Sequence, residues 1–286
     1  MEKTVHQFQT TTCKQRTLLL TRECASKPQR LLLLHGAGVA GETTWTFLAH
    51  YLTQWDEILI PDLAGMGEAQ FLNNQAPKLQ DYVNQVKELL AYFNWPKYEF
   101  DIAGYSFGGL VAESLLRHQP FNQLCFLLEP AMLFSGDCEQ VVDKGQCYLR
   151  VAKEVLANPS AELPYHHFLD LVSPKREKEG RTERLIIQRL QENAQGLAQA
   201  LMAITDALNQ DCVYYTQWQA PMSGASFVGG LSWDVMHQRH QRLAKESANW
   251  HYETVANADH SLVFTRPRSI AAVMNALKQR VTDSKS

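Results

Sequence analysis

The chain has 286 residues, of which 45% are hydrophobic and 20% charged, and its formal net charge is −3 at pH 7. This balance excludes the basic excess that attracts nucleic acid or anionic membrane, so we expect neither partner. The apolar runs at 18–20 and 31–34 are far shorter than the roughly 20 residues of a membrane span, and the N-terminus lacks a signal pattern. We therefore expect a cytoplasmic protein without a membrane span, and the oligomeric state stays open.

The predicted elements alternate between strands and helices, except in the middle of the chain. Strands are predicted near 5–12, 16–22, 30–35, 57–60, 98–103, 123–128, 225–230 and 250–256, and helices near 44–54, 78–94, 107–118, 236–247 and 267–281. Such alternation predicts an α/β architecture with a mostly parallel sheet, whose functional loops gather at the carboxyl edge of the strands.

The first motif in chain order is the glycine-rich loop His35-Gly36-Ala37-Gly38, which follows the apolar strand near 30–35. A loop of this kind leaves backbone N–H groups free to bind an oxyanion, and we predict that Ala37 supplies one such donor. The next loop follows the strand near 57–60. We interpret Asp62 as a residue that fastens this loop, with a tight turn at Gly65 and Gly67.

The strand near 98–103 runs into the pattern Gly104-Tyr105-Ser106-Phe107-Gly108, and a helical segment follows it. A serine in this pattern occupies a sharp strand-to-helix turn that exposes its hydroxyl, and side chains at 104 and 108 would collide with a neighbouring strand and helix. Ser106 is therefore the candidate nucleophile. The N–H of Phe107 is the predicted second donor to an oxyanion.

Residues 131–219 interrupt the alternation and are helical in character. Helices are predicted over 141–157, 164–171 and 181–209. We expect these residues to form a cap inserted into a core made of residues 1–130 and 220–286, and to shape the substrate pocket. Tyr214, Tyr215 and Trp218 could line an acyl site or form the core of the cap, and both readings stay open.

The six cysteines show no Cys-x-x-Cys spacing, and no set of metal ligands is apparent. We therefore expect no metal, no redox role for the cysteines and no cofactor.

The order of the motifs resembles that of the α/β-hydrolase superfamily, in its branch of cap-bearing esterases and C–C hydrolases. The resemblance rests on the His35-Gly36 loop, the loop from Asp62 to Gly67, the elbow at Ser106 and the late pair Asp259-His260, and it covers nearly the whole chain. It implies the α/β-hydrolase fold, with a mostly parallel eight-stranded sheet, flanking helices and an inserted helical cap.

The superfamily uses a catalytic triad in the chain order serine, acid, histidine, which implies His260 as the base. Between the cap and His260, Asp234 is the carboxylate that follows a strand end, so Asp234 is the expected acid. Its carboxylate would accept Nδ1–H of His260 and fix the tautomer that takes the serine proton. Glu129 is the alternative acid, because it follows the strand near 123–128 and some members of the superfamily carry their acid there.

The resemblance therefore implies a serine hydrolase that cleaves a carboxylic ester or thioester of a small-to-medium apolar acid, a small-molecule substrate. The same residues could cleave a C–C bond or an amide, because the fold does not choose the scissile bond. A catalytically silent protein that binds a ligand is a further alternative.

Overall fold

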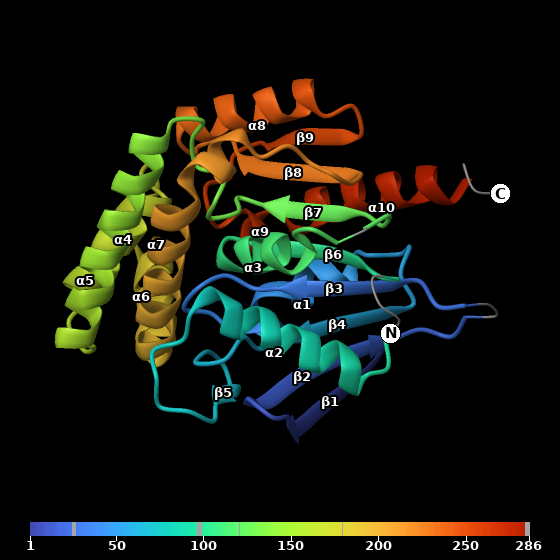
Figure 1. Ribbon diagram of the computed structural model, residues 1–286, viewed down its shortest axis with the longest axis horizontal. Helices are drawn as coiled ribbons and strands as arrows, with labels where there is room; N and C mark the ends of the chain where they lie inside the picture. Colours follow the sequence, from blue (N-terminus) through green and yellow to red (C-terminus); the bar gives the residue numbers. More distant parts are fainter. Residues whose placement is uncertain (25–26, 96–98, 120, 179, 284–286) are drawn as a thin grey trace.

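A mixed sheet forms the centre of the molecule (Figure 1). The structure is a computed structural model, and it describes residues 1–24, 27–95, 99–119, 121–178 and 180–283. The strands are β1 (Glu2–Gln9), β2 (Cys13–Thr21), β3 (Arg30–Leu34), β4 (Glu57–Pro61), β5 (Gln70–Phe71), β6 (Asp101–Tyr105), β7 (Cys125–Leu128), β8 (Gly224–Gly229) and β9 (Trp250–Val255). The helices are α1 (Gly41–His50), α2 (Leu79–Tyr92), α3 (Phe107–Leu116), α4 (Cys138–Ala157), α5 (Leu163–Val172), α6 (Arg181–Glu192), α7 (Ala194–Gln217), α8 (Asp234–Glu246), α9 (Leu262–Thr265) and α10 (Pro267–Asp283).

The strand order is β1-β2-β4-β3-β6-β7-β8-β9, and β5 pairs with β2 outside this path. Pairings of β2 are antiparallel, whereas β3, β4 and β6 to β9 form one parallel block. The eight predicted strands are present with shifted ends, and β5 is an addition. Tyr98, the first residue of the strand expected near 98–103, lies outside the described residues.

Helices cover both faces of the parallel block, which explains why its strands are apolar runs. Along β3, Leu32 and Leu34 pack toward α2, α3 and α8, whereas Leu31 and Leu33 pack toward α1, α9 and α10. Successive side chains of a strand point to opposite faces, so the leucine run serves two hydrophobic cores. The parallel block therefore holds its carboxyl-end loops between two hydrophobic cores.

Helices α4 to α7 follow β7 and precede β8, and they lie at the end of the sheet toward which β7 and β8 point (Figure 1). The single helix predicted over 181–209 is wrong, because α6 ends at Glu192 and α7 begins at Ala194. Asn193 between them has non-helical angles, and its Oδ1 accepts a hydrogen bond from the N–H of Gly67 at 2.9 Å. The Nδ2 of Asn193 donates to the carbonyl of Arg189 at 3.1 Å, and such a local bond from side chain to backbone competes with helix continuation.

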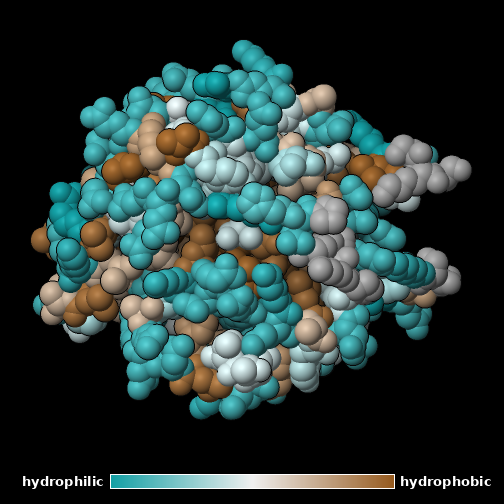
Figure 2. All heavy atoms as spheres, viewed as in Figure 1, coloured by the Kyte–Doolittle hydropathy of each residue, from teal (hydrophilic) through white to brown (hydrophobic). Residues whose placement is uncertain are grey.

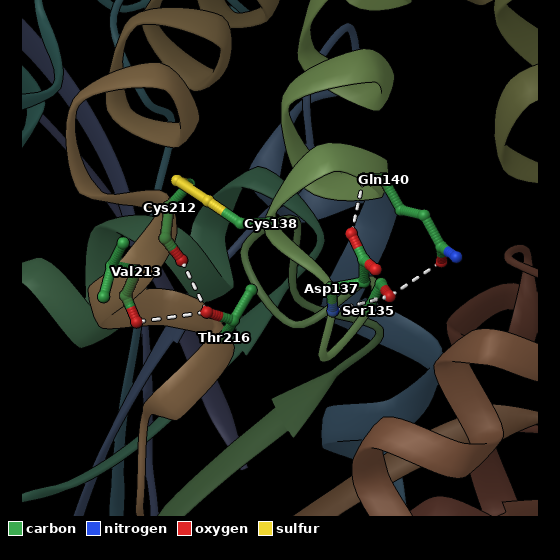
Figure 3. Close-up of a disulfide and its surroundings, with 7 residues drawn as sticks. All are labelled: Ser135, Asp137, Cys138, Gln140, Cys212, Val213 and Thr216. Atoms are coloured by element: carbon green, nitrogen blue, oxygen red, sulfur yellow. Dashed lines mark hydrogen bonds between the residues drawn. A yellow bond between two sulfur atoms is a disulfide. The ribbon is translucent and has the colours of Figure 1, made fainter.

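A disulfide joins Cys138, the first residue of α4, to Cys212 of α7 (Figure 3). The Asp137 carboxylate caps α4 by accepting from the N–H of Gln140 at 3.2 Å. The cysteine spacing did not predict this pair, which lies 74 residues apart in sequence. Disulfides persist mainly in oxidising compartments and are rare in cytosolic proteins. The disulfide therefore does not support the expected cytoplasmic location, which stays a prediction.

The face of the molecule drawn in Figure 2 is mostly hydrophilic, with hydrophobic residues visible near its middle between polar side chains. Among the described residues, no helix has the length and apolar character that crossing a membrane requires.

Candidate active site

The turn from β6 to α3 has the tight geometry that the Gly-x-Ser-x-Gly pattern predicts. Ser106 adopts φ +52° and ψ −113°, a strained conformation for a residue with a side chain. A Cβ at position 104 would lie 2.5 Å from the carbonyl oxygen of Gly108, and a Cβ at 108 would lie 2.2 Å from that of Leu34. Both glycines are therefore required by close backbone approach, to the helix in one case and to strand β3 in the other.

Three side chains from three loops meet at the carboxyl edge of the sheet. His260 Nε2 lies 3.1 Å from Ser106 Oγ, and His260 Nδ1 lies 2.7 Å from Glu129 Oε2. Ser106 follows β6, Glu129 follows β7 and His260 follows β9. Ser106 is 9% exposed, His260 8% and Glu129 1%, so the three groups interact in a site that is nearly closed to water.

The expectation that Asp234 accepts the Nδ1–H of His260 is not met, because Glu129 occupies that position. Strand β8 ends at Gly229 and a turn follows it, so that Asp234 becomes the first residue of α8. Its side chain is 86% exposed, and an oxygen of its carboxylate lies 3.8 Å from Nζ of Lys175. The first helical turn thus directs Asp234 outward, and the alternative acid, Glu129, is the carboxylate that contacts the histidine.

The glycine-rich loop after β3 lies against the serine, because a Cβ at Gly36 would be 3.2 Å from Ser106 Cβ. His35 orients this loop. Its Nε2 accepts from the N–H of Leu63 at 2.7 Å, which leaves Nδ1 to donate to the carbonyl of Gly36, also at 2.7 Å. Burial lowers the pKa of His35, so the ring is neutral and can accept at Nε2 while it donates at Nδ1.

This arrangement sets the direction of the Ala37 N–H. The Gly36 carbonyl and the Ala37 N–H belong to one planar trans peptide and point in opposite directions. With the carbonyl held by His35, the N–H points away from the His35 ring. Phe107 is the first residue of α3, and an N–H at that position has no acceptor within the helix. The role of Ala37 and Phe107 as oxyanion donors stays a prediction.

Asp62 fastens its loop as its pattern indicated. Its buried carboxylate accepts from the N–H of Gly41 at 2.8 Å and from the N–H of Glu68 at 3.1 Å. These bonds tie the loop after β4 to the start of α1. Asp62 therefore serves the framework of the site.

Sequence reasoning missed two residues that contact the site. The hydroxyl of Ser232 donates to Glu129 Oε1 at 2.5 Å, and the hydroxyl of Tyr105 donates to the backbone carbonyl of His260 at 2.9 Å. A lone serine in a turn has no sequence pattern that marks it as the partner of a carboxylate. The ring of Tyr105 packs against that of His260, with ring centroids 5.1 Å apart.

Tyr214 and Tyr215 belong to a different part of the molecule. The Tyr214 hydroxyl donates to Glu113 at 2.7 Å, and Arg117 donates to the Tyr215 hydroxyl at 2.7 Å. At 1.5 Å per residue along α3, Glu113 lies about 10 Å and Arg117 about 16 Å from Ser106. Tyr214, Trp218, Glu113 and Arg117 line a pocket of about 470 Å³ at the junction of α3 and α7. These contacts join α7 to α3, which differs from both expected roles, an acyl site and the core of the cap.

Helix α4 brings a lysine and a tyrosine close to the triad. The Lys144 ammonium bonds to the carbonyl of Leu171, and it lies 4.5 Å from the ring centroid of Phe134 and 5.3 Å from that of Trp233. Burial lowers the pKa of Lys144 to about 8, although the negative charge of Glu129 opposes this change. Burial also raises the pKa of Tyr148, one turn further on, and Glu129 contributes to that rise. Both side chains thus lie within electrostatic reach of the site.

Within the described part of the chain, no group of three or more His, Cys, Asp or Glu side chains is arranged to hold a metal ion.

Comparisons with known proteins agree with this fold. The family model described as "Alpha/beta hydrolase family" matches residues 31–273. No curated protein sequence matches the chain.

Three solved structures illustrate how widely proteins of this fold differ. A carboxylesterase from the thaumarchaeon Nitrososphaera gargenis is 15% identical, with a TM-score of 0.71, and the match covers 98% of this chain and 100% of that one. A 2-hydroxy-6-oxo-6-phenylhexa-2,4-dienoate hydrolase from Rhodococcus sp. strain RHA1 is 17% identical, with a TM-score of 0.71 and coverage of 97% and 99%. A laboratory-evolved variant of a potato epoxide hydrolase is 14% identical, with a TM-score of 0.73 and coverage of 98% and 100%. At such identities the likeness shows a shared fold and leaves the reaction open.

Proposed function

We propose that this chain, which belongs to the alpha/beta hydrolase family, is a serine hydrolase that cleaves a carboxylic ester or thioester of a small-to-medium apolar acid. The observation that carries the proposal is the continuous set of contacts from Ser106 through His260 to Glu129, at 3.1 and 2.7 Å. A hydroxyl within reach of an imidazole that a carboxylate orients is the arrangement that activates a serine as a nucleophile.

In the proposed reaction, Ser106 Oγ attacks the carbonyl carbon while His260 Nε2 takes the hydroxyl proton. Glu129 holds the tautomer of His260 that leaves Nε2 free to accept, and its charge stabilises the imidazolium that forms. The N–H groups of Ala37 and Phe107 bind the oxyanion of the tetrahedral intermediate. His260 then gives its proton to the leaving group, and water activated by the same imidazole releases the acid from the acyl-enzyme.

Two features support a substrate of modest size with an apolar acyl group. Ser106 and His260 are both less than one tenth exposed, so a substrate must enter beneath the helices that follow β7. Residues beside the site, such as Met132 and Phe107, are fully buried and apolar. The proposal therefore favours acyl chains that fit under the helices over polymers or long lipids.

The first experiment measures turnover of p-nitrophenyl esters and acyl-coenzyme A thioesters of increasing chain length, by wild type and by Ser106→Ala. A fluorophosphonate probe reports in parallel whether Ser106 reacts as a nucleophile. Turnover and labelling that both disappear in Ser106→Ala would support the proposal. Labelling without turnover of either series would favour cleavage of an amide or a C–C bond. A folded wild type that does not label would overturn the proposal in favour of a silent ligand-binding protein.

The identity of the acid is tested by a matched pair of variants, Glu129→Gln and Asp234→Asn. Glu129→Gln keeps the shape of the side chain but removes the charge that orients His260, so kcat is expected to fall by about 10³- to 10⁴-fold. Asp234→Asn changes an exposed group and is expected to stay within about twofold of wild type. If Asp234→Asn lost activity and Glu129→Gln did not, Asp234 would be the acid of the triad.

A further inference from the structure

Glu129 is held by donors that come from the turn after β8. Its Oε1 accepts from the N–H of Gly229 at 2.7 Å and from the hydroxyl of Ser232 at 2.5 Å, while Oε2 faces His260. Ser232 is 1% exposed. An ionised carboxylate can only accept hydrogen bonds, so the Ser232 hydroxyl is the donor in this pair.

The turn that carries Ser232 is fixed to the segment just before His260. The N–H of Leu231 donates to the carbonyl of Ala258 at 2.8 Å, and the N–H of Ser232 donates to the carbonyl of Gly229 at 2.9 Å. A Cβ at Gly229 would lie 2.6 Å from the carbonyl oxygens of Ala258 and Asp259, so the two segments are in close backbone contact. The hydroxyl therefore has a defined position relative to both Glu129 and the histidine loop.

We infer that Ser232 is a positioning residue for the hydrolase reaction, acting through Glu129; the inference rests on the proposed function. With Oε1 held by two donors, the carboxylate cannot rotate, and Oε2 stays directed at Nδ1 of His260.

The turn after β8 thus contributes a hydroxyl where the sequence predicted a carboxylate. The backbone of Glu129 adopts a positive φ of 41°, so the residue needs such fixed partners to keep its side chain in place.

Ser232→Ala, Ser232→Thr and a matched control, Ser226→Ala, test this inference. Ser226 is also a buried serine of the same strand and turn region, but its hydroxyl accepts from Trp250 Nε1 at 3.2 Å and has no contact with Glu129. Ser232→Ala is expected to lower kcat by about 10- to 100-fold, which corresponds to about 1.4–2.7 kcal/mol of transition-state stabilisation. KM should change by less than about twofold, because residue 232 is buried behind Glu129.

Rescue by threonine separates positioning from a general loss of structure. Ser232→Thr keeps the hydroxyl and should restore most of the activity. Ser226→Ala should leave kcat unchanged. A Ser232→Ala variant with wild-type kcat, or one that changes no more than Ser226→Ala, would overturn the inference.

The rate of fluorophosphonate labelling distinguishes failure of the inference from failure of the proposed function. If wild type labels at Ser106 and Ser232→Ala labels equally fast, the positioning role is wrong and the hydrolase proposal stands. If folded wild type neither labels nor turns over any ester, both proposals fail.

Discussion

Removing the disulfide between Cys138 and Cys212 should lower the stability of the protein by a calculable amount. The pair closes a loop with a sequence separation of 74 residues. In the chain-entropy treatment, releasing such a loop raises the entropy of the unfolded chain by about 15 cal/mol/K, which is about 4 kcal/mol at 25 °C. For a chain of this size, that loss corresponds to a fall in Tm of about 7 °C.

Other contacts between α4 and α7 stay in place when the cysteines are replaced. Thr205 Oγ1 still donates to the carbonyl of Gly145 at 2.8 Å, so the folded state should keep its structure while the unfolded state gains freedom. The expected loss is therefore a change in the free energy of unfolding without a change in activity at 25 °C.

The assay is denaturant unfolding of Cys138→Ser/Cys212→Ser beside wild type, after mass spectrometry has verified the disulfide in wild type. Cys147→Ser, which removes a free cysteine of the same helix, is the control and should behave like wild type. Wild type in a reducing buffer should match the double variant. A double variant within about 1 kcal/mol of oxidised wild type would refute the loop-entropy reasoning.

Three further predictions concern single buried groups. Burial lowers the pKa of Lys144 from 10.5 to about 8. Between these two pH values the unfolded chain binds more protons than the folded chain, so the free energy of unfolding should rise with pH, by roughly 3 kcal/mol in total. Lys144→Met should lack this rise when unfolding is measured from pH 7.5 to 10, and equal slopes would contradict it. Lys278→Met leaves the buried Asp101 carboxylate without the ammonium that lies 2.7 Å away, and should cost about 3–5 kcal/mol in urea unfolding. Adding Asp101→Asn should recover part of that loss, and no recovery would argue against the ion pair as the cause. Gly108→Ala places a Cβ 2.2 Å from a carbonyl oxygen of β3 and should destabilise the fold by about 3 kcal/mol. Gly230→Ala, whose Cβ would lie 3.5 Å from the nearest atom, should be tolerated when the thermal unfolding of the two variants is compared.

The sequence by itself identified the parts of the site that depend on neighbouring residues. The elbow at Ser106 needs glycine at 104 and 108 because the backbone of its own turn and of β3 leaves no room, and this requirement is visible as a five-residue pattern. The loop at Gly36 and the role of Asp62 were also predicted from short patterns, although their partners, Ser106 and Gly41, lie elsewhere in the chain. The alternation of strands and helices predicted the parallel sheet, because it depends on hydrophobic periodicity along the chain.

Only the tertiary structure decided which carboxylate faces His260. Strands β7 and β8 are neighbours and end at the same edge, so Glu129 and the turn before Asp234 both reach the site, and spacing along the chain does not separate them. The difference lies in the turn after Gly229, which directs Ser232 inward and starts α8 at Asp234, whose side chain points to solvent. The contact of Asn193 with the loop at Gly67 and the disulfide between Cys138 on α4 and Cys212 on α7 depend in the same way on partners that only folding brings close. Such contacts join residues up to 131 positions apart, and their geometry exists only after the sheet and the helices above it have assembled.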